Sequence, residues 1–200
     1  MRKPARTAQA GKACFDEGGG NGFGRGALKE GKKENSMADL KKFDENPQRQ
    51  LLEEIKGARC VMLGSPVHDA HMQPMAPQVD EETGIIYFYS DNTSELGSTI
   101  LARPSSVHMC HIAKDYQACV KGMLSPHSDP ATLDRFWNPV VEAWYPGGKT
   151  DPKMMMLKFE PHDAAVWASD KSSIGFLFEI TKANIKGEMP NMGKSKEIQL

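Results

Sequence analysis

Six histidines and four cysteines are the side chains of this chain with which a metal ion or an electrophile would react. His108 and His111 fall in a predicted strand, where residues three apart face opposite sides, so these two rings do not converge on one ion. The cysteines form no CxxC pair, and no carboxylate or further cysteine stands at a metal-site spacing. Ser65 and Ser125 lack the strand–turn–helix context of a nucleophilic serine. The sequence therefore predicts no metal site and no hydrolase chemistry, and it identifies no catalytic residue.

The aromatic segment WNPVVEAWYPGG, residues 137–148, is the second notable group, because it holds two of the three tryptophans. Its large rings stand beside Pro139, Pro146 and a Gly-Gly pair, which interrupt regular structure. This combination predicts a helix that ends in a shaped loop. What the loop does depends on the elements that surround it.

Short runs of strand-forming residues dominate the rest of the chain. A helix over 46–57 is predicted from the Asn46-Pro47 start signal, and further helices are predicted over 92–104, from Asp129 onward and over 172–188. Gly122 stands where a bulge or a close backbone approach is plausible. Six strands with few helices between them predict a mainly β (α+β) antiparallel barrel or sandwich: 60–63, 71–79, 85–90, 105–113, 116–125 and 154–169.

The charge distribution divides the chain into two parts. Residues 1–36 carry eight Lys or Arg against four acids and hold little apolar periodicity, so we expect a disordered, basic, glycine-rich leader over 1–42 and one folded domain over 43–200. The formal net charge of −1 gives no reason to expect nucleic acid as a partner. No apolar run is long enough to span a membrane. Without a secretory segment or a disulfide pattern, a cytoplasmic protein is expected.

Three segments together resemble one family. HMQPMAPQ (71–78), FYSDNTSEL (88–96) and YQACVKG (116–122) look like the flavin-binding strands and loop of the pyridoxamine 5′-phosphate oxidase superfamily. ARCVML, WNPVVEAWYPGG and VWAS resemble its bacterial general stress protein branch, and the resemblance covers about residues 43–195. It implies a six-stranded antiparallel split β-barrel with flanking helices that binds FMN as a homodimer.

The resemblance also implies a set of cofactor-binding residues. Trp137, Trp144 and Tyr145 become candidates for closing a flavin pocket, although these rings would equally suit a plug at the end of the barrel. The full set of predicted flavin-binding positions is Gln73, Met75, Ala76, Ser90, Asp91, Ser94, Leu96, Gln117, Trp144 and Trp167.

Two positions of this set, Gln73 and Leu96, and the neighbouring Glu95 depart from the family pattern. Gln73 stands where the family carries an arginine, and Glu95 and Leu96 stand where a basic pair meets the FMN phosphate. Charge-assisted bonds to a phosphate are worth about 1.5–3 kcal/mol each, so their loss weakens FMN binding unless other cations replace them. Lys114, Arg103 and Lys171 are candidates for that replacement.

Two functional classes therefore stay open. The first is an FMN-binding stress flavoprotein, with oxidoreductase activity on a small molecule, in which the flavin carries the redox chemistry. The second is a split-barrel dimer that has lost or changed its flavin ligand and acts as a binding or structural protein. The two classes differ in whether the purified protein is yellow.

Overall fold

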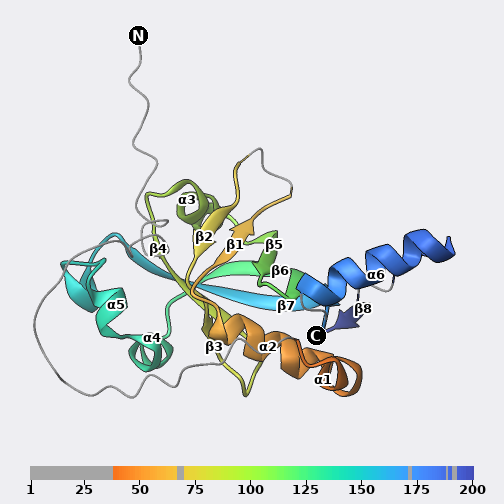
Figure 1. Ribbon diagram of the computed structural model, residues 1–200. Helices are drawn as coiled ribbons and strands as arrows, with labels where there is room; N and C mark the ends of the chain where they lie inside the picture. Colours follow the sequence, from red (N-terminus) through yellow and green to blue (C-terminus); the bar gives the residue numbers. More distant parts are fainter. Residues whose placement is uncertain (1–37, 67–69, 171–172, 188, 191–192) are drawn as a thin grey trace, which may run out of the picture.

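The computed structural model describes residues 38–66, 70–170, 173–187, 189–190 and 193–200. Figure 1 shows one curled antiparallel sheet with helices around its rim. The eight strands are β1 (Val61–Gly64), β2 (Gln73–Met75), β3 (Gln78–Val79), β4 (Ile86–Asp91), β5 (Ser105–Ile112), β6 (Tyr116–His127), β7 (Met154–Ala168) and β8 (Lys194–Gln199). The mainly β, antiparallel fold predicted from the sequence is confirmed.

The strand order in the sheet is β2-β1-β5-β6-β7-β4-β3, and β8 pairs with β7 off this path. The long strand β7 makes this branching possible. Its first part pairs with β4, from Met154 to Phe159, and its second part pairs with β8, from Asp163 to Ala168. Strand β6 runs along β7 on the other side over nearly its whole length.

The prediction of six strands was too low. The predicted strand 71–79 is two short strands, β2 and β3, separated at Ala76-Pro77, where Pro77 has no N–H for a ladder bond. Strand β8 was missed because its sequence, KSKEIQ, alternates charged and polar residues and buries only Ile198. It pairs along β7, and this pairing rather than its own pattern makes it a strand.

The predicted irregularity at Gly122 is confirmed. The β6–β7 register shifts between Lys121 and Gly122. A Cβ at Gly122 would lie 2.3 Å from the carbonyl oxygen of Glu160, so only glycine allows the two strands to approach here. The bulge separates the part of β7 that faces β4 from the part that faces β8.

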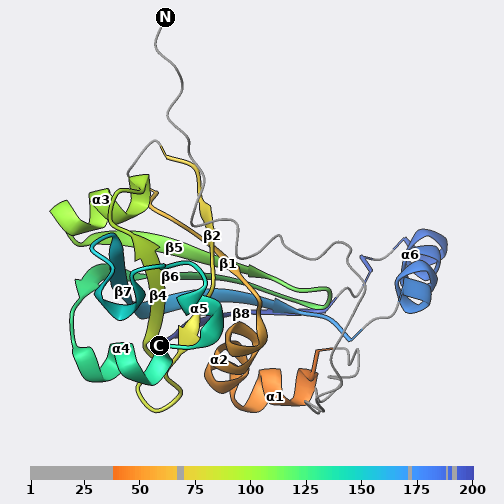
Figure 2. The ribbon, with the colours of Figure 1, turned by 90° about the vertical axis from the view of Figure 1, so that its left-hand side faces the viewer.

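Helices follow the capping signals of the sequence. They are α1 (Leu40–Glu45), α2 (Pro47–Gly57), α3 (Glu95–Ala102), α4 (Pro130–Phe136), α5 (Pro139–Glu142) and α6 (Ser173–Lys186), with a 3₁₀ turn at Gly148–Thr150. Asn46 accepts a hydrogen bond from the Arg49 N–H at the start of α2, and Asp129 accepts from Thr132 N–H at the start of α4. Figure 2 shows α1 and α2 packed on one side of the sheet.

Helix α1 was not predicted. Asp39 caps it, and Phe43 is fully buried against the core. The predicted boundary between leader and domain, at residue 43, therefore falls inside a helix that packs on the sheet. The rest of the predicted leader, residues 1–37, lies outside the described residues.

The core lies on the inner, α2-covered face of the sheet. Strands β5, β6 and β7 alternate between buried and more exposed residues, as half-buried strands do. The inward side chains include Val107, Met109, Val120, Phe159 and Val166, and the helix α2 adds Leu51 and Ile55.

The opposite side of β1, β5, β6 and β7 carries a second apolar surface. Register places Met62, Cys110, Cys119 and Ala165 in one row across the four strands, with Ile112, Gln117 and Trp167 in the next row. We call its apolar members the outer patch: Met62, Cys110, Ile112, Cys119, Ala165 and Trp167. Ile112 is 77% exposed and Trp167 is 45% exposed, while the other four members are partly exposed, so within the described chain this surface is largely open.

None of the helices in the described part of the chain combines the length and the apolar character that crossing a bilayer demands.

Candidate functional site

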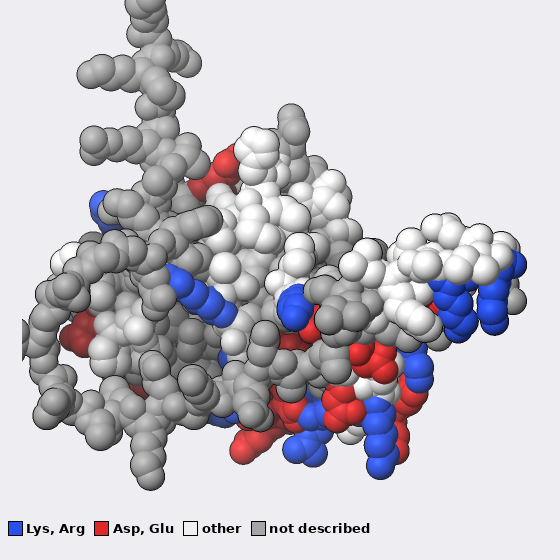
Figure 3. Space-filling model, in the orientation of Figure 1, with Lys and Arg blue, Asp and Glu red and all other residues white. Residues whose placement is uncertain are grey.

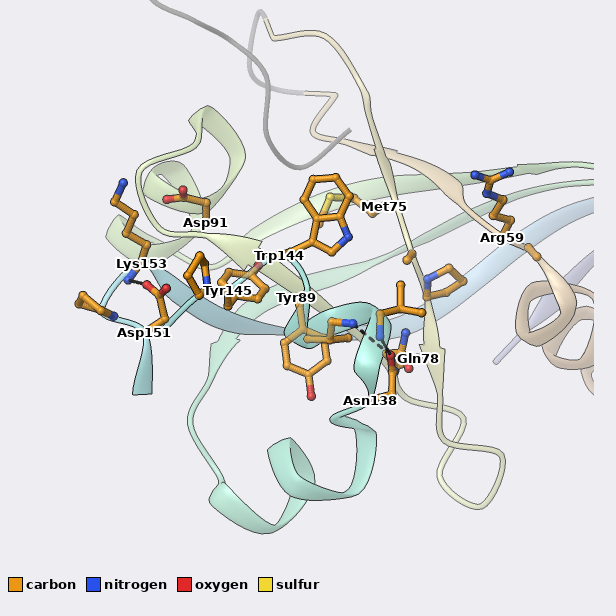
Figure 4. A pocket seen from close by; sticks show the side chains of 17 residues that line it. Arg59, Met75, Gln78, Tyr89, Asp91, Asn138, Trp144, Tyr145, Asp151 and Lys153 are labelled. Carbon is orange, nitrogen blue, oxygen red and sulfur yellow. Dashed lines mark hydrogen bonds between the residues drawn. The ribbon is translucent and has the colours of Figure 1, made fainter. Parts of the chain in front are cut away.

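A cleft of about 790 Å³ opens between the sheet and the segment that follows α4. Its first wall is formed by residues 75–78 around the β2–β3 break and by Tyr89 and Asp91 of β4. Its second wall is formed by residues from Asn138 to Pro146, and residues 151–153 and 58–59 close its two ends. Figure 4 shows Tyr89, Trp144 and Tyr145 gathered in the middle, with Arg59 at one end and Lys153 at the other.

The second wall is built by local signals in the WNPVVEAWYPGG segment. The Asn138 side chain accepts hydrogen bonds from the N–H groups of Val140 and Val141, which starts α5. The helix lasts four residues, and the chain then turns at Gly148, whose φ is +64°. The Gly147 N–H donates to Asp151 Oδ2 at 3.1 Å and closes the turn. The predicted helix with a shaped loop is confirmed.

An ion pair between the buried carboxylate of Asp80 and the half-exposed guanidinium of Arg135 attaches this wall to the sheet. Both guanidinium NH₂ groups of Arg135 on α4 donate to the carboxylate of Asp80, each at 3.0 Å. Burial is the largest single influence and would raise the pKa of Asp80. The hydrogen bonds from Arg135, Thr83 and the Glu82 N–H, together with the Arg135 charge, outweigh it, so the pKa lies below its usual value. The two-point geometry fixes α4 against the β3–β4 turn.

Aromatic contacts order the middle of the cleft. The Tyr89 hydroxyl donates to the Leu133 carbonyl at 2.9 Å, and its ring meets Trp137 edge-on with 5.8 Å between centroids. Trp137 also contacts Tyr145, at 6.5 Å. Trp144 and Tyr145 line the cleft, whereas Trp137 does not and instead supports Tyr89 and Tyr145. Of the two tryptophans, only Trp144 therefore lies where it could cover a ligand in this cleft.

The phenols of the cleft are protonated at neutral pH. Burial, with a smaller effect of the Asp134 charge, raises the pKa of Tyr89 to about 12. Burial and the nearby carboxylates of Asp91 and Asp151 also raise the pKa of Tyr145. Both rings therefore act as apolar surfaces and hydrogen-bond donors, not as bases.

Charged side chains stand at the two ends of the cleft. Asp91 Oδ1 accepts from the Thr93 N–H at 2.7 Å and from its hydroxyl at 2.6 Å, so this carboxylate holds the turn after β4. Asp151 accepts from backbone N–H groups of Gly147 and Lys153. Arg59 and Lys153 form no side-chain ion pair with any residue in the described ranges. These two cations are consequently available to an anionic group in the cleft.

Four of the predicted site residues line the cleft: Met75, Ala76, Asp91 and Trp144. Four others lie around α3 and β2 and do not line it. Ser94 caps α3, accepting from the Gly97 N–H at 3.0 Å, and Ser90 is 1% exposed and 3.5 Å from the Ser94 hydroxyl. Leu96 is packed in the hydrophobic core, where a basic side chain would have no access to water, and Gln73 pairs with Leu63 on β1.

The remaining two predicted residues lie on the outer sheet face. Gln117 and Trp167 are register neighbours on β6 and β7, and Gln117 Nε2 donates to the Ala113 carbonyl at 2.8 Å. Within one chain, the structure does not bring them to the cleft. Of the candidate replacement cations, Arg103 and Lys114 do not line the cleft and Lys171 lies outside the described residues.

Sequence reasoning missed Tyr89, Asn138, Arg59 and Lys153 as cleft residues. Tyr89 had a usable signal, because it alternates with the core residues Phe88 and Ser90 and so faces the other side of β4. Asn138 carried a capping signal before Pro139. The two cations had no signal, since they lie in loops that meet only in the folded chain.

The described residues contain no group of three or more His, Cys, Asp or Glu side chains placed to hold a metal ion. The cysteines among them are free, and Cys110 and Cys119 face each other across β5 and β6 with 3.8 Å between sulfurs. Burial and the neighbouring thiol raise the pKa of Cys110 to about 11, so it is protonated at neutral pH.

Comparison with known proteins identifies the relatives of this fold. Residues 46–191 match the family model described as pyridoxamine 5′-phosphate oxidase like. No curated protein matches the sequence. Among solved structures, a general stress FMN/FAD binding protein from Xanthomonas citri is 36% identical, with a TM-score of 0.57 over 63% of this chain and 90% of that one.

Two further structures cover more of the chain. A protein assigned to general stress protein 26 from Jannaschia sp. CCS1 is 29% identical, with a TM-score of 0.62 over 76% of this chain and 96% of that one. A protein assigned to the general stress family from Xanthomonas campestris pv. campestris is 36% identical over 68% of this chain and 93% of that one, with a TM-score of 0.58. The chain therefore belongs to the pyridoxamine 5′-phosphate oxidase-like family.

Proposed function

We propose that this protein is a flavin-binding general stress protein that holds FMN, or a close flavin analogue, in the cleft beneath Trp144. The observation that carries the proposal is the cleft itself. Its volume of about 790 Å³ lies within the range of about 300–1,000 Å³ typical of small-molecule sites. The similar protein from Xanthomonas citri is named for FMN/FAD binding, which supports the same ligand class.

The lining of the cleft fits a flavin ring. Tyr89, Trp144 and Tyr145 offer flat apolar surfaces, and Met75 and Val141 add aliphatic contact. A tricyclic ring buried among such side chains is shielded from water, and the neutral phenol of Tyr145 can donate a hydrogen bond to one of its carbonyl oxygens, whereas the Tyr89 hydroxyl already donates to Leu133. The bound flavin would supply the redox chemistry, and this chain would supply its position and surroundings.

The phosphate of FMN has a different partner from those expected from the family pattern. Leu96 is buried in the core and Gln73 carries no charge, so neither can neutralise a dianion. Arg59 and Lys153 line opposite ends of the cleft and have no ion-pair partner among the described residues. We assign the phosphate to Arg59, because the end that holds Lys153 also holds the carboxylates of Asp91 and Asp151, which would repel it.

A homodimer is part of this proposal. The outer patch exposes Ile112 and Trp167 on a flat sheet face, and exposed apolar surfaces of this kind mark protein interaction sites. Pairing two outer patches would bury them in a self-complementary interface. It would also explain how Gln117 and Trp167, which are remote from the cleft of their own chain, could approach the ligand of a second chain. Neither a nucleic acid nor a membrane is required.

Absorption spectroscopy and ligand titration test the proposal. The purified full-length protein is expected to be yellow, or to become so with added FMN, and to quench flavin fluorescence on titration. FMN, FAD and riboflavin should be compared, because only the first two carry phosphate. Bleaching of the bound flavin by NADH or NADPH would then establish oxidoreductase activity on a nicotinamide donor.

A colourless protein that binds none of the three flavins would favour the second function. In that case the chain would be a stress-protein dimer that has lost or changed its ligand. The observation that favours this second function is that Leu96 is packed in the hydrophobic core. The family pattern has a basic residue at this position, facing the phosphate.

A further inference from the structure

Helix α6 exposes three of its large apolar side chains in the part of the chain that the structure describes. Leu177, Phe178 and Ile185 are 64%, 67% and 80% exposed. Leu177, Thr181 and Ile185 follow a helical i, i+4, i+8 pattern, and Phe178 lies beside them, three residues before Thr181 and seven before Ile185. We call Leu177, Phe178, Thr181 and Ile185 the α6 stripe. The sequence predicted an apolar side made of Ile174, Leu177, Phe178 and Ile180 together. Of the three whose side chains the structure describes, Leu177 and Phe178 are exposed and Ile180 is turned partly inward.

Three other described side chains of α6 are turned partly inward. Glu179, Ile180 and Ala183 are partly covered, and the Glu179 side chain is only 15% exposed. Figures 1 and 2 show α6 standing beyond the ends of β6 and β7, away from the other helices. A surface helix normally faces its core with its apolar side, and 14 residues in water are about the limit of a marginally stable helix. In the described part of the chain, nothing packs on the α6 stripe, so the helix lacks the apolar contact that would stabilise it.

The outer patch is the second uncovered apolar surface of the same chain, and it is close to α6 in sequence. Trp167 stands on β7, which ends at Ala168, and α6 begins at Ser173. In Figure 3 the lysines of α6 lie along its lower side, and uncharged atoms cover its upper side. Uncharged atoms also cover the neighbouring body surface over β1 and β5. A single partner can cover both the helix and the sheet.

We propose that the α6 stripe packs on a second copy of this chain, at the edge of the interface that the two outer patches form. This inference rests on the homodimer of the proposed function. A twofold interface repeats every contact, so two stripes add their area to two patches. The three large stripe residues expose on the order of a few hundred Å², a substantial part of the roughly 800 Å² per partner that a stable interface buries.

A membrane surface is the competing partner, because Lys182 and Lys186 flank the stripe as basic residues flank interfacial helices. It would contact α6 alone and would leave Ile112 and Trp167 exposed. A second chain covers all of these side chains at once, and this is why it is the occupant that we propose.

Sedimentation velocity of the full-length protein across a concentration series tests the stripe. The variant Leu177→Gln/Phe178→Gln keeps two good helix formers at exposed positions and removes only apolar surface. The matched control, Lys182→Gln/Lys186→Gln, changes two residues of the same helix outside the stripe. We expect the stripe variant to raise the dimer dissociation constant at least tenfold and the control to leave it within about twofold.

Hydrogen exchange of the unmodified protein gives a second test that needs no variant. Amides of residues 173–186 should be protected at concentrations above the dimer dissociation constant and exchange quickly below it. A stripe variant with the dissociation constant of the original chain, or equal exchange at both concentrations, would overturn the α6 proposal while the outer-patch dimer stands. A protein that is monomeric throughout would overturn both.

Vesicles containing phosphatidylglycerol provide the last measurement. Binding to them that depends on the stripe, in a protein whose dimerisation ignores the stripe, would assign α6 to a lipid surface and contradict the second-copy assignment. Flavin titration of the stripe variant as a concentrated dimer should be unchanged, which separates this inference from the flavin proposal.

Discussion

The cleft and the outer patch are two apolar surfaces of one chain that are built in opposite ways. The cleft is concave, its Asn138, Asp91 and Asp151 side chains are engaged in caps and turns, and its wall is held by the Asp80–Arg135 ion pair. The outer patch is flat, and it consists of strand residues that the described chain leaves largely open. Predicted flavin-binding residues occur on both.

The difference indicates what each surface requires. A concave site with ordered walls can hold a small molecule within one chain. A flat apolar face gains stability only when a comparably large surface is placed on it. We therefore expect the cleft to decide which ligand binds and the outer patch to decide how two chains associate. Substitutions should be able to separate the two.

Substitution at the Gly122 bulge should cause the largest loss of folding stability. Gly122→Ala places a Cβ 2.3 Å from the Glu160 carbonyl oxygen and 2.7 Å from the Phe159 ring. We expect the free energy of unfolding, measured with urea, to fall by about 3 kcal/mol, because the two long strands must move apart. Gly84→Ala is the control, since Gly84 has a positive φ but open space, and it should cost about 1 kcal/mol. Equal losses at both positions would contradict the bulge argument.

Charges on the outer patch should break the assembly. Ile112→Glu/Trp167→Glu is expected to raise the dimer dissociation constant at least a hundredfold, or about 2.7 kcal/mol, because both carboxylates would be buried in the interface. Sedimentation velocity measures the effect. Lys121→Glu, on the same face in the adjoining charged row, serves as a less damaging comparison. A double variant that remains a dimer would place the interface elsewhere.

Removing the central ring of the cleft should affect ligand binding but not assembly. Trp144→Ala is expected to weaken flavin binding about tenfold or more, with the dimer dissociation constant unchanged. Trp137→Phe is the control, because Trp137 supports the cleft from behind without lining it. If Trp144→Ala bound flavin as well as the original chain, the ligand would not lie in this cleft.

Removing one cation at a time tests which end of the cleft binds the FMN phosphate. Arg59→Gln is expected to weaken FMN binding about tenfold while riboflavin binding stays the same, because only FMN presents a phosphate dianion. Lys153→Gln should have a smaller effect, since its end of the cleft already holds two carboxylates. The loss should shrink as salt is added to the titration. The reverse ranking of the two variants would move the phosphate to the Lys153 end.

The stability of the folded chain should depend on pH through His111, which is buried in the core beneath the outer patch, and not through residues of the patch itself. Burial lowers the pKa of His111, and the Glu54 carboxylate 4.0 Å away does not compensate. The unfolded chain then binds a proton that the folded chain does not, so stability should fall as the pH drops below about 6.5, the ordinary histidine pKa. His111→Phe should flatten this part of the urea-midpoint profile. An unchanged profile would assign the acid sensitivity to other groups.

Much of the fold could be predicted from the sequence because its signals are local. Asn46-Pro47, Ser94 and Asp129-Pro130 start helices where expected, and period-two alternation marks β5 and β6. The branch at β7 could not be predicted, since β8 has a polar sequence and becomes a strand only by pairing. The split of β2 from β3 depended on a single proline.

The site was predictable only in part. The sequence by itself determined the aromatic segment, its caps and the loop that brings Trp144 and Tyr145 to a wall, because capping and turn formation are decided by neighbours in the chain. Only the tertiary structure decided that Leu96 faces the core, that Arg59 and Lys153 share a cleft, and that Gln117 and Trp167 lie on another face. These placements depend on how a curled sheet brings distant segments together, and side-chain contacts across such distances leave no periodicity in the sequence.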